Sequence, residues 1–382
     1  FRALLSFLLP SSPSPEALMT AGLGQQNLLP VAFAHTSEQI GMPAHRHWLP
    51  LAALTVDSVL YACQSLCAKK LSQAGIVPLE IVVLRGVFMI LWCISGLPVE
   101  GRPMATWLGE TFQEVRLLGL RALLGFCGIS FGFAALSMLP LAEYQVLLQT
   151  MPIFSSLFAL LFLGERWHCS EAMGAIAAAL GVVLSAGPEL LHLFSDAGRR
   201  GDGSGSDLIT GGGAQAALGA GAAYALMQVV CASGAGVVMR MLGTQLKVHW
   251  LLVMMYQGLG QVIFGAVNLY LSGQAWIPLE QQDALWALGL GLFCCLAQSA
   301  MTWGLQRVKV AMASVVMACV SPAIAMLLQA AFLPAERLSL RTVAAFGIIS
   351  AGLAIAVAGK SWREAADKGE EEQVGYKKLS GP

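Results

Sequence analysis

The feature that most constrains this chain is the stretch from Arg121 to Glu165. Between these end residues the only side chain normally charged at pH 7 is Glu143, so the stretch forms two apolar blocks of about 20 residues that meet at Pro140. A helix needs about 20 apolar residues to cross the ~30 Å hydrocarbon layer, where it satisfies its own backbone hydrogen bonds. The stretch predicts two membrane crossings joined by a tight hairpin, because Pro140 has no N–H and restricts Leu139.

A buried helix pair in a large soluble domain could have the same pattern, but such apolar blocks recur along the 382 residues, which favours membrane crossings. Hydrophobic residues make up 57%, charged residues 12%, and the mean hydropathy is +0.69. These values place the bulk of the protein in lipid. The formal net charge is zero, which gives no reason to expect a nucleic-acid partner. The nine cysteines lie almost entirely in apolar segments and are interpreted as packing residues.

Short motifs follow one another in a fixed order in the same stretch. They are a basic residue that opens a helix, Ala134-Ala135-Leu136, Leu139-Pro140-Leu141-Ala142, Pro152, and Phe162-Leu163-Gly164-Glu165-Arg166. In order and spacing they resemble the EamA domain of the drug/metabolite transporter superfamily. The resemblance implies an all-α integral membrane protein whose ten transmembrane helices form two inverted five-helix EamA repeats.

A second copy of the pattern lies about 170 residues further along the chain. The matching positions are Pro152 with Pro322, Phe162-Leu163 with Phe332-Leu333, Glu165-Arg166 with Glu336-Arg337 after one inserted residue, and Gly181 with Gly352. A weak internal repeat of this kind is expected when two halves pack about a pseudo-two-fold axis. The two Glu-Arg pairs fall at helix ends, and we interpret them as structural groups that cap or bridge loops.

Hydropathy predicts ten crossings and five regions. The crossings are at roughly 49–68, 77–97, 117–139, 142–163, 170–191, 214–239, 250–272, 284–305, 311–333 and 340–359. The regions are an N-terminal segment over 1–48 that is disordered or a targeting remnant, a first repeat over 49–191, a Gly/Ser-rich linker over 192–213, a second repeat over 214–360 and a charged, disordered tail over 361–382.

The distribution of basic residues predicts the orientation in the membrane. With a cytosolic N-terminus, most of the 22 Lys and Arg residues fall on the cytosolic side, Arg121 among them, whereas Lys69 falls on the opposite side. This bias places both termini of a multi-pass protein in the cytosol. The sequence does not distinguish the plasma membrane from organelle membranes, and a homodimer is compatible with it.

Ionisable side chains inside the crossings are the first candidates for function, because each costs at least ~2.5 kcal/mol on insertion scales. Asp57 in the first crossing shares a helix face with Tyr61 and Gln64, and Arg85 lies midway along the second. Arg85 can bind a carboxylate or phosphate bidentately, with Asp57 as its resting counter-ion or as a proton carrier. The alternative is a structural ion pair of Arg85 with Asp57 or Glu80.

Further polar residues extend this face to other crossings. Glu143 and Gln149 lie on the fourth crossing, where Glu143 could instead snorkel to the interface. Tyr224 and Gln228 lie on the sixth and Gln298 on the eighth. Such a face fits a central cavity between repeats, although interhelical hydrogen bonds of about 0.6 kcal/mol each are an alternative explanation. The predicted substrate-binding residues are Asp57, Tyr61, Gln64, Arg85, Glu143, Gln149, Tyr224, Gln228 and Gln298.

The sequence shows no enzyme, cofactor or metal motif. None of the six histidines lies mid-membrane, and no His-x-x-x-His or Gly-x-Ser-x-Gly pattern occurs. With the resemblance, this predicts a secondary transporter that moves a small polar organic solute by alternating access through a cavity between the repeats. Its partners are that solute and the lipid bilayer. A nucleotide-sugar or sugar-phosphate antiporter and a non-transporting membrane receptor or scaffold remain open as alternatives.

Overall fold

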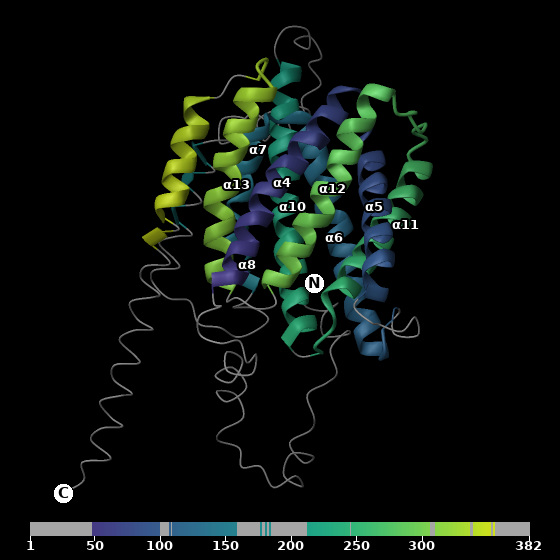
Figure 1. Cartoon of the computed structure of the whole chain (residues 1–382). Coiled ribbons are helices and arrows are strands. Elements are labelled where there is room, and N and C mark those ends of the chain that lie inside the picture. Colours follow the sequence, from purple (N-terminus) through teal and green to yellow (C-terminus); the bar gives the residue numbers. More distant parts are fainter. Residues whose placement is uncertain are drawn as a thin grey trace, which may run out of the picture.

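The computed structural model describes residues 48–99, 107, 109–158, 176–177, 180–181, 183–184, 212–244, 246–305, 310–336, 339–352 and 354–355. These residues form a bundle of helices without strands (Figure 1). The helices are α4 (Trp48–Gln73), α5 (Pro78–Val99), α6 (Phe112–Met138), α7 (Leu141–Leu148), α8 (Met151–Phe158), α10 (Gly212–Thr244), α11 (Trp250–Leu271), α12 (Gln281–Leu305) and α13 (Val310–Phe332). A shorter apolar helix, Leu340–Gly352, follows.

Six helices in the described part of the chain are long and apolar enough to cross a membrane: α4, α5, α6, α10, α11 and α12. The 27 residues of α6, for example, extend about 40 Å at 1.5 Å per residue, which exceeds the ~30 Å hydrocarbon thickness. These six correspond to the first, second, third, sixth, seventh and eighth predicted crossings. The predicted terminal segments lie outside the described residues apart from Trp48, as does the linker apart from Gly212 and Gly213.

The fourth crossing differs from the continuous helix predicted over 142–163. The helix is interrupted by a turn at Gln149 and Thr150. This turn separates α7 from α8, each of which has eight residues. Pro152 has no backbone N–H, so it cannot complete the helical hydrogen bond to Leu148. The Thr150 hydroxyl instead donates to the Leu147 carbonyl at 2.9 Å, and the chain beyond Phe158 lies outside the described residues.

The tight hairpin predicted at Pro140 is confirmed. α6 ends at Met138 and α7 begins at Leu141, and the Leu139 N–H still donates to the Ala135 carbonyl at 2.8 Å. Pro140 precedes the first residue of α7, where a missing N–H costs nothing in the helix. A second tight turn joins α4 to α5 and contains Gly75 at φ +92°, a conformation that glycine adopts without strain.

The two halves of the chain pack against each other in antiparallel helix pairs. Near the start of α4, Leu54 lies against Gly304 of α12, and near its end Cys67 lies against Gly289. α4 and α12 therefore run in opposite directions. α10 and α12 run in the same direction because two reversals of the chain separate them. The first helix of the second half thus runs opposite to that of the first half, as the inverted-repeat resemblance implies.

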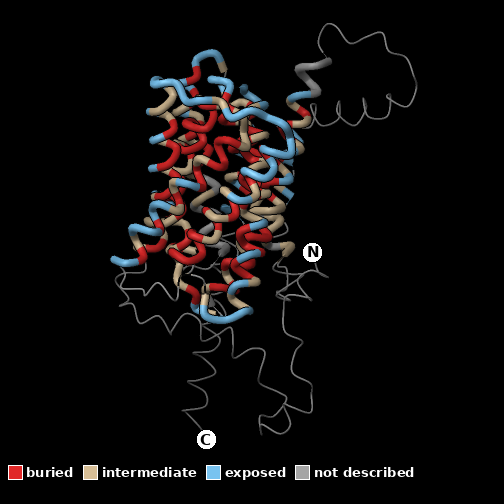
Figure 2. Tube along the Cα trace, turned by 90° about the vertical axis from the view of Figure 1, so that its right-hand side faces the viewer, coloured by how far each residue is buried: buried red, intermediate tan, exposed pale blue. Residues whose placement is uncertain are grey.

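The interfaces between the halves also follow a two-fold pattern. α4 packs on α12, and α10, its counterpart, packs on α6, while α5 and α11 pack on each other. Gly86 and Gly258 face each other where α5 and α11 cross: a Cβ on Gly86 would lie 2.9 Å from the Gly258 carbonyl oxygen. Buried residues run along the interior of the bundle, and exposed residues lie on its outside and ends (Figure 2).

Candidate functional site

A closed ring of three hydrogen bonds joins both halves of the bundle. The Tyr144 hydroxyl donates to Gln228 Oε1 at 2.9 Å, and Gln228 Nε2 donates to the Tyr61 hydroxyl at 3.1 Å. The two hydroxyls are 3.3 Å apart. Because the Tyr144 hydroxyl proton is donated to Gln228, the bond between the two hydroxyls must be donated by Tyr61, which closes the ring. This ring brings together the predicted residues Tyr61 and Gln228, and it adds Tyr144, which sequence reasoning did not single out.

Glycines on α6 make room for this ring. A Cβ on Gly132 would collide with the Gln228 amide, and one on Gly128 would lie 3.5 Å from Cys231 Cβ. These two residues let α6 and α10 approach closely and leave space for the buried Gln228 side chain. The polar ring and the small-residue stripe of α6 are therefore parts of one packing arrangement.

Arg85 lies on α5, one residue before the glycine contact with α11, and is 3% exposed. Its Nη2 donates to Gln298 Oε1 at 3.3 Å, and Gln298 Nε2 donates to Thr302 Oγ1 at 3.4 Å. Arg85 Nε and Nη1 are buried and have no hydrogen-bond partner. A buried donor left without a partner costs about 1–3 kcal/mol, and more for a charged group. The predicted residues Arg85 and Gln298 are thus in contact, and Arg85 Nε and Nη1 are left without an acceptor.

Arg121 is a second buried arginine, also 3% exposed, which the sequence analysis placed on the cytosolic side. α6 begins at Phe112, before the predicted boundary at 117, so Arg121 lies on the order of 14 Å into the helix. Its guanidinium lies over Gly125, beside Gln257 of α11, and its Nε has no partner. Arg85 lies close by along the chain of contacts, because Gln257 precedes Gly258, which contacts Gly86 next to Arg85. The glycine one turn after Arg121 was the available sequence signal.

Three glutamines share this lack of partners. Both polar atoms of Gln64 on α4 and of Gln261 on α11 are buried without a hydrogen bond, as is Oε1 of Gln257. Gln261 lies at the crossing with α5, where its Cβ would be 2.9 Å from a Cβ on Gly86. We call Gln64, Arg85, Arg121, Gln257 and Gln261 the unpaired cluster, after the buried polar atoms without a hydrogen bond that each of them has. Its members come from α4, α5, α6 and α11, and therefore from both halves.

The other predicted residues lie apart from this cluster or have other roles. Asp57 is buried, but no hydrogen bond or ion pair joins it to the described residues, so it does not pair with Arg85. The Glu80 carboxylate accepts from the Ile277 N–H at 3.2 Å rather than from Arg85. Glu143 is half-buried on the first turn of α7. Neither predicted ion pair of Arg85 is therefore present.

Gln149 and Tyr224 also have contacts of their own. Gln149 lies at the break between α7 and α8, where its Nε2 donates to the Gln145 carbonyl at 3.0 Å. Gln145 in turn bridges Ser65 of α4 and Ser321 of α13, each at 3.0 Å. Tyr224 is 37% exposed, and its ring is stacked 6.0 Å from that of Phe131. The structure does not bring Tyr224 together with the buried predicted residues.

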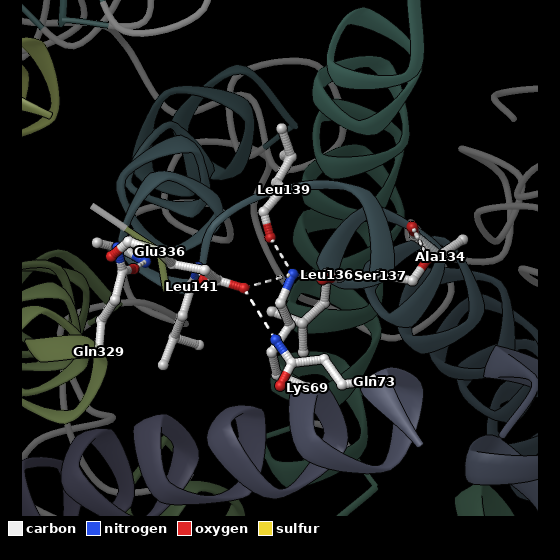
Figure 3. Close-up of polar contacts among 10 residues, drawn as sticks. Lys69, Gln73, Ala134, Leu136, Ser137, Leu139, Leu141, Gln329 and Glu336 are labelled. Atoms are coloured by element: carbon white, nitrogen blue, oxygen red, sulfur yellow. Dashed lines mark hydrogen bonds and ion pairs between the residues drawn. The ribbon is translucent and has the colours of Figure 1, made fainter. Parts of the chain in front are cut away.

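A polar cluster lies at the ends of α4, α6 and α13 and the start of α7, and we call it the end lock (Figure 3). Lys69 Nζ donates to the carbonyls of Leu136 and Leu139 at 2.9 and 2.7 Å and forms an ion pair with Glu336 Oε1 at 3.1 Å. The other Glu336 oxygen accepts from the Leu141 N–H at 3.2 Å. Opposite charges thus stabilise the C-terminus of α6 and the N-terminus of α7.

The end lock also links the halves. Gln73 Nε2 donates to Glu336 at 3.2 Å, and Gln329 Oε1 accepts from the Ala142 N–H at 2.6 Å. Lys69 and Gln73 belong to α4, whereas Gln329 and Glu336 come from α13 and the turn after it. The prediction that Glu336 caps or bridges is confirmed. Within the described ranges, no group of three or more His, Cys, Asp and Glu side chains could hold a metal ion.

Comparisons with known proteins agree with this architecture. Human solute carrier family 35 member G1 is 26% identical to the chain over 254 residues, which cover 66% of this chain and 64% of that protein, less than two thirds of its length. One solved crystal structure matches 82% of this chain and 98% of its own with a TM-score of 0.56 at 19% identity, which shows a shared fold. The model of the EamA-like transporter family matches twice, at residues 48–187 and 219–358. The chain belongs to the EamA-like transporter family.

Proposed function

We propose that this multi-pass membrane protein is a secondary transporter, which moves a small polar organic solute by alternating access along a route between its two inverted halves. Family membership supports transport as the activity. The single observation that carries the route is the unpaired cluster, since its buried polar atoms come from both halves and have no protein partner.

An inert bundle gives no reason for such a cluster. Buried polar groups in proteins are nearly always hydrogen-bonded, and each unpaired one costs about 1–3 kcal/mol. Gln64, Gln257 and Gln261 together leave five polar atoms unsatisfied. A solute with hydroxyl, carboxyl or phosphate oxygens would supply the missing partners. A receptor or scaffold that only presents a surface needs no unsatisfied groups in its interior.

The end lock supports alternating access for a different reason. Its contacts join α4 to the end of α13, so they hold the two halves together at one end of the bundle. Alternating access requires the halves to separate at each end in turn. We propose that the end lock closes the route in the state described here and opens when solute enters from that side.

Counterflow in proteoliposomes tests this function. Vesicles with the purified chain are loaded with unlabelled solute and given the labelled form outside, for amino acids, sugar phosphates, nucleotide sugars, carboxylates, sugars and organic cations in turn. We expect labelled solute of one class to accumulate transiently above the level in protein-free vesicles. Its uptake should be stimulated by unlabelled solute on the opposite side of the membrane. Flux without such stimulation indicates a channel. No flux of any class from a chain with an intact thermal transition rejects transport and favours the receptor or scaffold alternative.

The orientation is a proposal of the same kind. With both termini in the cytosol, the end lock and the loop between α11 and α12 face the opposite side of the membrane. That loop includes the exposed residues Gly273 and Trp276. An epitope inserted at Gly273 should then be shielded from cytosolic antibody in sealed vesicles, while one at the C-terminus should be accessible. The reverse pattern rejects the orientation.

A further inference from the structure

The two buried arginines of the unpaired cluster have no carboxylate counter-ion among the residues that the structure describes. Neither Arg85 nor Arg121 forms an ion pair with any described residue, although each is 3% exposed. The two carboxylates that the sequence suggested as partners of Arg85 do not pair with it: Glu80 accepts from the Ile277 N–H, and Asp57 makes no ion pair with either arginine. Two like charges in a low-dielectric interior repel and are poorly solvated. The site therefore has two positive charges that require a negatively charged partner from outside the described residues.

The donors left over are those that an anion accepts. Arg85 offers Nε–H and Nη1–H, and Arg121 offers Nε–H, all buried and without partners. Arginine donors match carboxylate and phosphate oxygens in pairs, which makes such contacts stronger than neutral hydrogen bonds. The amides of Gln64 and Gln261 add neutral donors and acceptors that suit hydroxyl groups. Of the glutamines with unpaired atoms, Gln257 lies beside Gly125, as the Arg121 guanidinium does.

The geometry points to a binding site for a small organic anion with two or more negative charges, a dicarboxylate or a phosphate monoester, held by Arg85 and Arg121 between α5, α6 and α11. This inference rests on the proposed transport function and deepens it by naming the solute class. Two guanidinium groups favour two negative charges, because a singly charged solute would leave one arginine uncompensated. The surrounding amides select a solute that also carries polar neutral groups.

The two repeats contribute unequally to the positive charge of this site. Arg85 precedes Gly86, and the corresponding residue before Gly258 is Gln257. The two halves thus present a cation and a neutral amide at matching places along the crossing. The positive charge of the site comes from the first half, and the second half supplies amides.

Thermal stability with and without anion provides the first test. Succinate, glycerol phosphate, inorganic phosphate, chloride, glucose and choline are added separately to the purified full chain in detergent. We expect succinate or glycerol phosphate to raise the melting temperature, and Arg85→Gln and Arg121→Gln each to weaken the apparent affinity at least roughly tenfold. Arg116→Gln is the matched control, since Arg116 lies on α6 near the Phe112 ring and outside the cluster. It should leave the affinity unchanged.

The melting temperature without anion separates a binding role from a structural one. Arg85→Gln and Arg121→Gln each remove a buried charge that has no carboxylate partner among the described residues. Without anion, each variant should therefore melt at the same temperature as wild type or higher. A marked fall in both variants would show that the arginines support the fold and would overturn the inference. An anion-induced shift that survives in the double variant would overturn it as well. So would a shift that chloride or inorganic phosphate produces while succinate and glycerol phosphate produce none.

Counterflow with the same solutes keeps this inference distinct from the proposed function. Uptake of an anion by wild type and not by Arg85→Gln supports both. Uptake of glucose or choline that is unchanged in Arg85→Gln and Arg121→Gln rejects the anion site and leaves the transporter standing. Anion-dependent stabilisation without uptake of any solute supports the site and rejects transport.

Discussion

Replacing Lys69 tests whether the end lock stabilises the bundle. Lys69→Met keeps most of the aliphatic side chain and removes the ammonium group, which donates to two backbone carbonyls and pairs with Glu336. The two side chains are only 7% and 16% exposed, so solvent does not replace the lost partner well. Breaking a buried ion pair from one side costs about 3–5 kcal/mol, and we expect a loss of stability in that range.

The adjacent lysine provides the control. Lys70 is half-buried, and its ammonium lies 6.0 Å from the centre of the Trp286 ring. Such a cation–π contact is worth about 0.5–1 kcal/mol where the site is exposed, so Lys70→Met should cost no more than that. The pair of variants shares the chemical change and the helix, and differs in the partners that are lost.

Unfolding in a denaturing detergent, followed by tryptophan fluorescence, measures the difference. Because the loss arises mainly from an uncompensated Glu336, adding Glu336→Gln to Lys69→Met should restore part of the stability and give a coupling energy of at least about 1.5 kcal/mol. Equal stabilities of Lys69→Met and Lys70→Met, or additive effects in the double variant, would refute the reasoning that the ion pair and its caps act as one unit.

Three smaller changes have expected outcomes that thermal unfolding can check. Gly86→Ala places a Cβ 2.9 Å from a backbone oxygen of α11 and should destabilise the protein by about 1–3 kcal/mol, whereas Gly236→Ala, with no atom within 4 Å, should not. Tyr144→Phe opens the hydrogen-bond ring and should cost about 1–3 kcal/mol, while the 85% exposed Tyr270 tolerates the same change. Gly75→Ala at φ +92° should cost on the order of 1 kcal/mol through backbone strain alone, and no measurable loss would argue against that conformation.

Sequence reasoning predicted the features that depend on local composition. Apolar blocks of membrane length and the Pro140 hairpin depend on residues close together in the chain, and the family prediction made from motif order is confirmed. The break at Gln149 was missed because a proline in an apolar run permits either a kink or a break. In α13 the matching Pro322 lies inside a continuous helix. Tertiary contacts, such as that of Ser233 with the Met151 carbonyl, support the break and are not visible locally.

The candidate site was predicted only in part, for a related reason. Helical periodicity put Tyr224 and Gln228 on one face, yet only Gln228 turns inward, because residues four apart differ by about 40° around the helix. Arg121 was missed because an arginine at the edge of an apolar block is normally assigned to the interface. In the structure α6 begins at Phe112, more than one turn before the predicted boundary at 117, so the Arg121 charge lies inside the bundle.

The antiparallel pairing of the two halves has a consequence for synthesis. α4 finds its main neighbours, α12 and α13, only after more than half of the chain has been made. Until then Lys69 lacks its partner Glu336, and Gln228 has not reached Tyr61. The first half must therefore wait in the bilayer with polar groups facing lipid or a membrane chaperone. A ribosome stalled before α10 should leave a nascent chain that the membrane quality-control machinery degrades.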